Sequence, residues 1–448
     1  MRLTPFVLAA LAATPLAARA ADSRDAQIAA LESRIHALEA NAQSLQQQAS
    51  DALAAAKAAQ AELQQMKAAQ SSQAVAAASA PAASAAPSAG SAANAFNPAI
   101  SLILNGLYEH HSLASDDYRR AGFPLVGEAG PGPQGLHLGE SELSFAASID
   151  DKFYGQLTLS MDSAGGETHT GIEEAYIDTT ALPDGFTLRA GRFYSNVGYL
   201  NSHHTHTDFF SDRPLAYQAF LGNQYGDDGV QARWVAPTDT YLEIGGEVFR
   251  GDNFPAGGAA NAGSGVKTLF LHAGGDIGVE QAWLAGVSLL RADARGAEDG
   301  FSGRDNLYLA DLTWKWAPRG AFKDAGVVLR SELFLDDRKG TVTDLADPAQ
   351  PAVAWDGQRR GAYLEGLYRF SRQWDAGYRY DRLWAPSSGP YASEHDPQRH
   401  TAMLTWHNSE FSLFRLQYSH DAPQAHFIDH ALMLQYQVSL GAHGAHKF

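Results

Sequence analysis

Residues 308–316 read YLADLTWKW, and their side chains alternate between two kinds of surface. Every second residue is apolar or aromatic, while Asp311, Thr313 and Lys315 fall between them. A period of two is the signature of a β-strand whose faces meet different surroundings. The same alternation recurs at 153–162 (FYGQLTLSMD) and 432–440 (LMLQYQVSL). A soluble sandwich would alternate in the same way, so the choice of fold depends on the number of strands and their connections.

The alternating segments are numerous and regularly spaced after residue 98. We count about sixteen, an even number, as bacterial outer-membrane barrels require. The candidate strands are 99–110, 136–149, 152–162, 171–181, 186–193, 229–236, 241–250, 266–274, 281–293, 305–317, 325–336, 360–370, 374–384, 398–407, 411–420 and 427–441.

The connections between these strands largely alternate between short and long. Tight turns are expected at 150–151, 182–185, 236–240, 275–280, 371–373 and 408–410, and long polar or Gly/Pro-rich loops at 111–135, 163–170, 194–228, 251–265, 337–359 and 385–397. Short periplasmic turns on one rim and long loops on the other are the outer-membrane arrangement.

This pattern leads to a closed membrane-spanning sheet. No segment after the N-terminus has eighteen consecutive apolar residues, so no transmembrane helix is expected. Strands in lipid cannot leave an open edge, and a sheet of this size closes around an aqueous lumen. We therefore predict an all-β transmembrane antiparallel barrel over residues 99–448.

The first residues have the features of an export signal. Arg2 is followed by an apolar run from Phe6 to Leu16 and by Ala-Arg-Ala at 18–20, which predicts a secretory signal peptide over 1–20. The chain has 33 Lys and Arg against 50 Asp and Glu, a net charge of −17, and it has no cysteine. Such an acidic chain argues against nucleic-acid binding, which needs clustered basic residues. We expect the protein to be located in the bacterial outer membrane.

Residues 21–70 form a separate segment with a heptad pattern. Apolar residues recur at both seam positions, from Ile28 and Leu31 to Leu63 and Met66, without glycine or proline. This predicts a periplasmic coiled coil that holds the protein in a homo-oligomer, although one amphipathic helix on a globular core would also fit. Residues 71–98 are rich in Ala, Ser and Pro and predict a flexible linker.

The loop 194–228 interrupts the alternation and is the third long loop. It contains His203, His204 and His206, with Asp208 close behind. Imidazole suits Zn, Cu and Ni, and without cysteine the good ligands are His and carboxylate. These four residues are the predicted metal ligands, and Zn²⁺ is expected as a substrate or weakly bound ion, with no cofactor required. A solvated polar loop without metal is the alternative.

Charged residues at inward positions of the predicted strands could line the pore. Opposed rows of acids and bases would tune ion selectivity, whereas ion pairs between them would brace the wall. The acidic set is Glu140, Glu142, Glu173, Glu174, Glu243 and Glu247, and the basic set is Arg189, Arg192, Arg233, Arg291, Arg330, Arg369 and Arg379. Five of these are the predicted pore-lining residues: Arg189, Arg192, Arg233, Glu243 and Glu247.

Enzyme motifs such as GxSxG, HExxH and the P-loop are absent from the sequence, so no catalytic site is expected. The runs GLHLGESELSFAASIDDKFYGQLTL (135–159) and EEAYIDT (173–179), the stretch 182–258 and the ending SLGAHGAHKF (439–448) carry a family resemblance. They resemble porin-like outer-membrane proteins often labelled zinc-regulated outer-membrane receptors. More distantly, the stalk and barrel are similar to phosphate-selective and carbohydrate porins.

The resemblance implies an outer-membrane channel connected with zinc limitation, an inward-folded third loop and a trimer. We therefore expect a porin-type channel for small solutes that assists uptake of zinc or another divalent metal. Two alternatives stay open: a non-conducting anchor in the outer membrane, and a metal-binding surface receptor.

Overall fold

The computed structural model describes residues 98–441 except 116, 165–166, 258–260 and 262. The predicted signal peptide (1–20), coiled coil (21–70) and linker (71–98, apart from its last residue) lie outside the described residues, as do residues 442–448.

Seventeen strands make up one sheet. Their bounds are β1 (Ala99–His111), β2 (Gly135–Leu138), β3 (Ser141–Ser148), β4 (Phe153–Ala164), β5 (Glu167–Thr179), β6 (Phe186–Tyr194), β7 (Gly226–Val235), β8 (Tyr241–Phe249), β9 (Val266–Ile277), β10 (Gln281–Arg295), β11 (Phe301–Trp316), β12 (Gly326–Val342), β13 (Val353–Ser371), β14 (Trp374–Trp384), β15 (Gln398–Ser409), β16 (Ser412–Gln424) and β17 (Phe427–Gly441).

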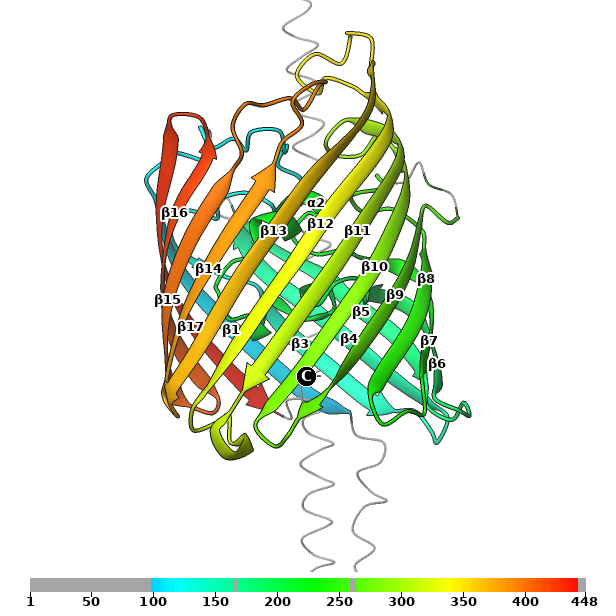
Figure 1. Cartoon of the computed structure of the whole chain (residues 1–448), viewed down its shortest axis with the longest axis vertical. Coiled ribbons are helices and arrows are strands. Elements are labelled where there is room, and N and C mark those ends of the chain that lie inside the picture. The colour runs from blue at the N-terminus through cyan, green and yellow to red at the C-terminus, as the bar shows by residue number, and fades with distance from the viewer. Residues whose placement is uncertain (1–97, 116, 165–166, 258–260, 262, 442–448) are drawn as a thin grey trace, which may run out of the picture. The chain divides into compact units, whose positions relative to one another are not determined.

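The sheet closes into an antiparallel barrel. Each strand pairs with its neighbours in sequence, and β1 pairs with β17 from Ser101 opposite Gly441 to His111 opposite Ala431. Both β2 and β3 pair with β1, so they are two parts of one wall strand, interrupted at residues 139–140. Counting them together gives sixteen strands, which confirms the predicted number. Figure 1 shows the tilted strands around the interior.

The two faces of each strand meet different surroundings. On β11, Tyr308 and Leu312 are exposed on the outer face, whereas Asp311 and Thr313 are buried toward the lumen. Exposed apolar side chains continue around the outside, for example Leu269 on β9 and Leu364 on β13. An apolar exterior over a polar interior is the arrangement of a barrel in lipid.

The only α-helix within the described residues is α2 (Leu215–Phe220), accompanied by the short 3-10 helices η1 (Leu200–Ser202), η2 (Thr205–Thr207) and η3 (Pro318–Gly320). No helix in the described part of the chain is long and apolar enough to cross a membrane.

Two of the predicted long loops are largely strand. The predicted loop 163–170 belongs mostly to β4 and β5, which reach Ala164 and resume at Glu167. The predicted loop 337–359 shrinks to 343–352, because β12 and β13 extend into it. These extensions carry polar outward residues, so hydropathy alone did not mark them as strand. The loop 385–397 agrees with the prediction.

The segment between β6 and β7 folds into the barrel. This third loop, residues 195–225, carries η1, η2 and α2 (Figure 1). Its apolar residues form a buried cluster with inward side chains of the wall, among them Phe193, Leu290, Leu307 and Phe334. The lumen is therefore partly filled by packed side chains.

Candidate functional site in the lumen

A fully buried carboxylate on β12 anchors the third loop. Glu332 accepts hydrogen bonds from the Tyr217 hydroxyl (2.9 Å) and from the backbone N–H groups of Tyr199 (3.0 Å) and Leu200 (3.3 Å). The hydroxyl of Tyr363 on β13 also donates to it, at 2.6 Å. A buried carboxylate is stable only with such donors, so these bonds fix the start of the loop against the wall.

Apolar packing reinforces this anchor. All six residues of α2 are buried, and the helix contacts β12, β13 and β14. The Phe220 ring stacks on Phe334 with 5.8 Å between ring centroids, and Tyr217 meets the same ring edge-on at 5.2 Å. Aromatic pairs in these arrangements stabilise beyond the area they bury. This half of the lumen is a packed core.

A second anchor is ionic. Asp212 in the third loop lies 2.9 Å from the guanidinium of Arg379 and 2.8 Å from that of Arg399, on β14 and β15. Burial would raise the pKa of Asp212, but Arg379, Arg399 and a hydrogen bond from Gln417 outweigh it and lower the pKa to about 2. The carboxylate is therefore held charged, and the loop is bound to the wall through it.

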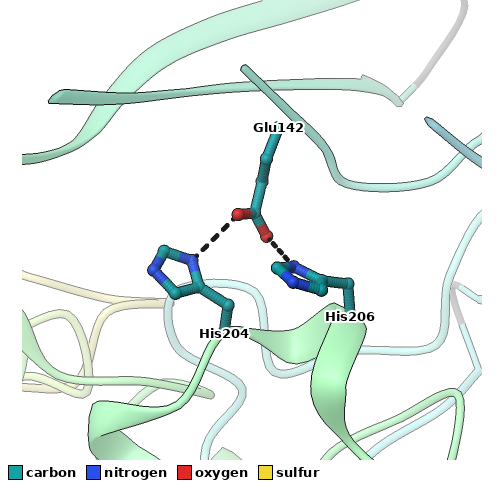
Figure 2. A group of neighbouring side chains, drawn as sticks. All are labelled: Glu142, His204 and His206. Carbon is teal, nitrogen blue, oxygen red and sulfur yellow. Dashed lines mark hydrogen bonds and ion pairs between the residues drawn. The ribbon is translucent and has the colours of Figure 1, made fainter. Parts of the chain in front are cut away.

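Two of the predicted metal ligands converge on a glutamate of β3. The carboxylate of Glu142 lies 3.0 Å from Nδ1 of His204 and 2.6 Å from Nδ1 of His206. Figure 2 shows Glu142 extending from its strand toward both imidazoles. His204 is the N-cap of η2, and His206 lies within it. The side chains of Glu142 and His206 are at least nine-tenths buried, and that of His204 is slightly more exposed.

More carboxylates surround this pair of histidines. Glu174 on β5 lies 3.0 Å from Nε2 of His204, and Glu173 lies 3.6 Å from Nδ1 of the same ring. Ligand atoms of Glu140, Glu142 and Glu173 also lie within 4.8 Å of one another. Burial would lower the pKa of His204, but the carboxylates Glu142, Glu173 and Glu174 outweigh it and raise that pKa well above its usual value.

The other two predicted ligands lie elsewhere. The His203 ring stacks on Tyr199 with centroids 4.6 Å apart, and its Nδ1 lies 2.7 Å from the Tyr199 carbonyl oxygen. Asp208 pairs with the guanidinium of Arg213 at 2.7 Å. Burial nevertheless raises the pKa of Asp208. The structure thus joins His204 and His206 to Glu142 and gives His203 and Asp208 other contacts.

The predicted pore-lining charges take part in ion pairs. Arg189 pairs with Asp178 at 2.7 Å, and Arg233 approaches Glu243 at 3.5 Å. Arg192 lies near the rim that carries the long loops, paired with Asp228 at 2.8 Å, and is about half exposed. These pairs favour the wall-bracing alternative for the three arginines. Arg291, expected to face inward, is exposed.

Glu247 holds the beginning of the third loop through hydrogen bonds. It accepts hydrogen bonds from the backbone N–H of Asn196 at 2.9 Å and from Gln231 at 2.7 Å, and it also bonds the Ser195 hydroxyl. Glu243 contacts Nδ2 of Asn196 at 3.2 Å. Both predicted lumen glutamates are therefore buried supports of the third loop.

A cavity of about 800 Å³ remains beside the loop. It is bounded by inward residues of β1, β4, β5 and β15–β17, by parts of the first loop (112–134) and by the third loop. Ten carboxylates but only three arginines, and no lysine, lie on its wall. Burial, together with Asp162 and Glu173, raises the pKa of Glu128 in the first loop. Acidic side chains therefore outnumber arginines on the cavity wall.

The sequence did not reveal Glu142 as the partner of the two histidines, or Glu332 as the central anchor. Period two correctly placed Glu142, Glu173 and Glu174 toward the lumen. The pairing of loop with wall depends on how the third loop folds, which no short-range pattern encodes. The available signal was the position of inward carboxylates on neighbouring strands near the base of that loop.

Comparisons with known proteins found similar solved structures and a relative by sequence. Salmonella typhi OmpF, determined in complex with daunomycin, matches with a TM-score of 0.53 and 11% identity over 78% of this chain and 99% of OmpF. Pseudomonas putida OprB matches with a TM-score of 0.49 and 9% identity over 77% and 94% of the two chains. An uncharacterized protein of Aquifex aeolicus (strain VF5) is 29% identical over 395 residues, 79% of this chain and 80% of that protein. No family model matches. The likeness to OmpF shows that the chain has the fold of an outer-membrane porin barrel.

Proposed function

We propose that this protein is an outer-membrane channel through which small solutes diffuse. The carrying observation is a closed sixteen-strand barrel whose third loop folds inward and leaves an acidic cavity of about 800 Å³ beside it. A loop held by Glu332, Glu247 and Asp212 narrows the lumen while the wall strands stay intact. A fixed constriction of this kind selects solutes by size and charge.

The charge of the cavity favours cations as the preferred solutes. Carboxylates outnumber arginines on its wall, and low-dielectric walls of one sign raise the local concentration of the opposite charge. Divalent metal ions, including Zn²⁺, are the finer candidates. The excess of carboxylates and the resemblance of 182–258 to zinc-regulated outer-membrane receptors support them.

Oligomerisation belongs to the same proposal. The heptad pattern of 21–70 supports a periplasmic stalk that holds protomers together, and a trimer is the state implied by the resemblance.

Single-channel recording of the purified protein in planar bilayers tests the function. We expect discrete conductance steps from protein that migrates as a folded, heat-modifiable band on unboiled gels. If folded protein inserts into the bilayer without conductance steps, the channel function is refuted, and a non-conducting anchor remains.

A further inference from the structure

We infer that the side chains of Glu142, His204 and His206 form a binding site for a divalent transition-metal ion, with Zn²⁺ the best-suited common ion, joining the third loop to the barrel wall. The inference rests on the proposed function only in that the ion reaches the site through the lumen.

The donor atoms have the composition and spacing of a metal site. Two imidazole nitrogens and a carboxylate face one another within 4.8 Å. Two histidines with one glutamate are a known zinc ligand set that leaves a fourth position for water. In a tetrahedral site with ligand distances of about 2.0 Å, neighbouring donor atoms lie about 3.3 Å apart. The two imidazole nitrogens lie 3.0 and 2.6 Å from different oxygens of the Glu142 carboxylate, so the donor atoms must move apart to admit the ion.

The local charge points to a cation. Glu140, Glu142, Glu173 and Glu174 gather around the two histidines. Among the ion pairs of the described residues, Glu142, Glu173 and Glu174 have His204 or His206 as partners and neither Arg nor Lys. Buried carboxylates need compensating charge, which a divalent ion supplies at short range.

The surroundings of His204 match those of a metal-bound imidazole. Its Nδ1 faces Glu142, and its Nε2 lies 3.0 Å from the Glu174 carboxylate. Metal-ligating histidines typically donate their second ring N–H to a carboxylate, which orients the ring and increases its basicity. The Tyr194 ring packs edge-on against the imidazole, with centroids 5.6 Å apart. Glu174 is therefore a positioning residue.

Two carboxylates lie between the cavity and the site. Glu140 and Glu173 lie on the cavity wall, and the side chain of Glu173 is 6% exposed with one oxygen, Oε2, lacking a hydrogen-bond partner. With Glu142 these residues form a second cluster of three carboxylates that shares Glu142 with the histidine site. A hydrated divalent ion can be received by oxygen ligands at the cavity wall and passed to the nitrogen-containing site.

The experiment measures Zn²⁺ binding to the full chain folded in detergent, using zinc chloride in competition with a chromophoric chelator. The variants are Glu142→Gln, His206→Gln and Glu174→Gln, with His203→Gln as the matched control on the same loop. We expect at least a tenfold loss of affinity for the two ligand variants, a loss of about tenfold for Glu174→Gln, and no change for His203→Gln. Heat-modifiable migration confirms that each variant is folded.

X-ray absorption on the zinc-loaded parent adds a readout independent of the variants. We expect nitrogen and oxygen neighbours at about 2.0–2.1 Å with two imidazoles. No zinc binding by the folded parent, equal affinity in all variants, or a loss confined to His203→Gln would overturn the inference. Binding is measured in detergent and does not depend on conductance. A barrel that binds Zn²⁺ but does not conduct would refute only the proposed channel function. A barrel that conducts but does not bind Zn²⁺ would refute only the proposed metal site.

Discussion

The hydroxyl of Tyr217 lies 2.9 Å from the carboxylate of Glu332, and this bond ties the only α-helix of the described residues to the wall strand β12. Both side chains are fully buried. The loop that shapes the lumen is thus held by a polar contact inside an apolar core.

Removing that hydroxyl should destabilise the loop. In Tyr217→Phe the buried carboxylate keeps its other donors but loses one hydrogen bond, which should cost about 1–2 kcal/mol of unfolding free energy. Urea unfolding in detergent, followed by tryptophan fluorescence, measures this. Tyr308→Phe is the control, since Tyr308 is exposed on the outer face and should leave stability unchanged. Equal stability of the two variants would show that the bond does not hold the loop.

Gly198 is required beside the same anchor. Its φ is +65°, and a Cβ there would meet Oε2 of Glu332 and lie 2.8 Å from the Tyr217 hydroxyl. Gly278 has a φ of +67° with nothing within 4 Å of its Cβ position. Both Ala substitutions incur about 1–2 kcal/mol of backbone strain, and Gly198→Ala should lose about 2 kcal/mol more by displacing the anchor. The same urea measurement should separate them, and identical losses would contradict the anchor.

Acid should weaken the ionic anchor only at low pH. The pKa of Asp212 is about 2 in the folded protein against an ordinary 3.8, so the folded state binds fewer protons between these values. The resulting stabilisation, about 2 kcal/mol, is fully present above about pH 4 and is lost as the pH falls toward 2. Asp212→Asn should lose this amount at pH 7. It should also flatten the pH dependence of the unfolding free energy between pH 4 and 2. A parent whose stability is constant across that window would contradict the pair.

The sequence predicts the strands of the barrel but not the contacts of the candidate site, and the reason is physical. Outward residues such as Leu312 and Leu364 must be apolar in lipid, so period two located the strands. Where β4 and β5 extend beyond that band, at Ser163 or Thr168, outward residues need not be apolar, and the sequence pattern predicts a loop there. The histidines marked the third loop correctly. Their partner Glu142 is 62–64 residues away in sequence, and only tertiary packing brings it there.

The coiled-coil prediction has its own test. Deleting residues 21–70 should leave a barrel that folds and inserts but forms weaker oligomers, because the heptad seam would no longer bury its apolar residues between protomers. Light scattering in detergent gives the oligomer number of both forms. If both forms have the same oligomer number at the same protein concentration, residues 21–70 are not the oligomerisation element.

Charge removal at the cavity wall should reduce cation preference. Glu173→Gln removes a carboxylate from the wall. An effect of about 1 kcal/mol, or on the order of fivefold in the cation-to-anion permeability ratio, is expected for charges this close to a permeating ion. Glu410→Gln, in the exposed turn between β15 and β16, is the control and should leave the ratio unchanged. Matching ratios in all three proteins would place the selectivity elsewhere.

The reversal potential of the parent in a salt gradient across a planar bilayer tests the central claim most directly. A channel with ten carboxylates and three arginines on the wall of its lumen cavity should give a reversal potential of the sign set by cation flow. A reversal potential of zero or of the opposite sign, from channels opened by folded protein, would contradict a cation-preferring passage beside the third loop.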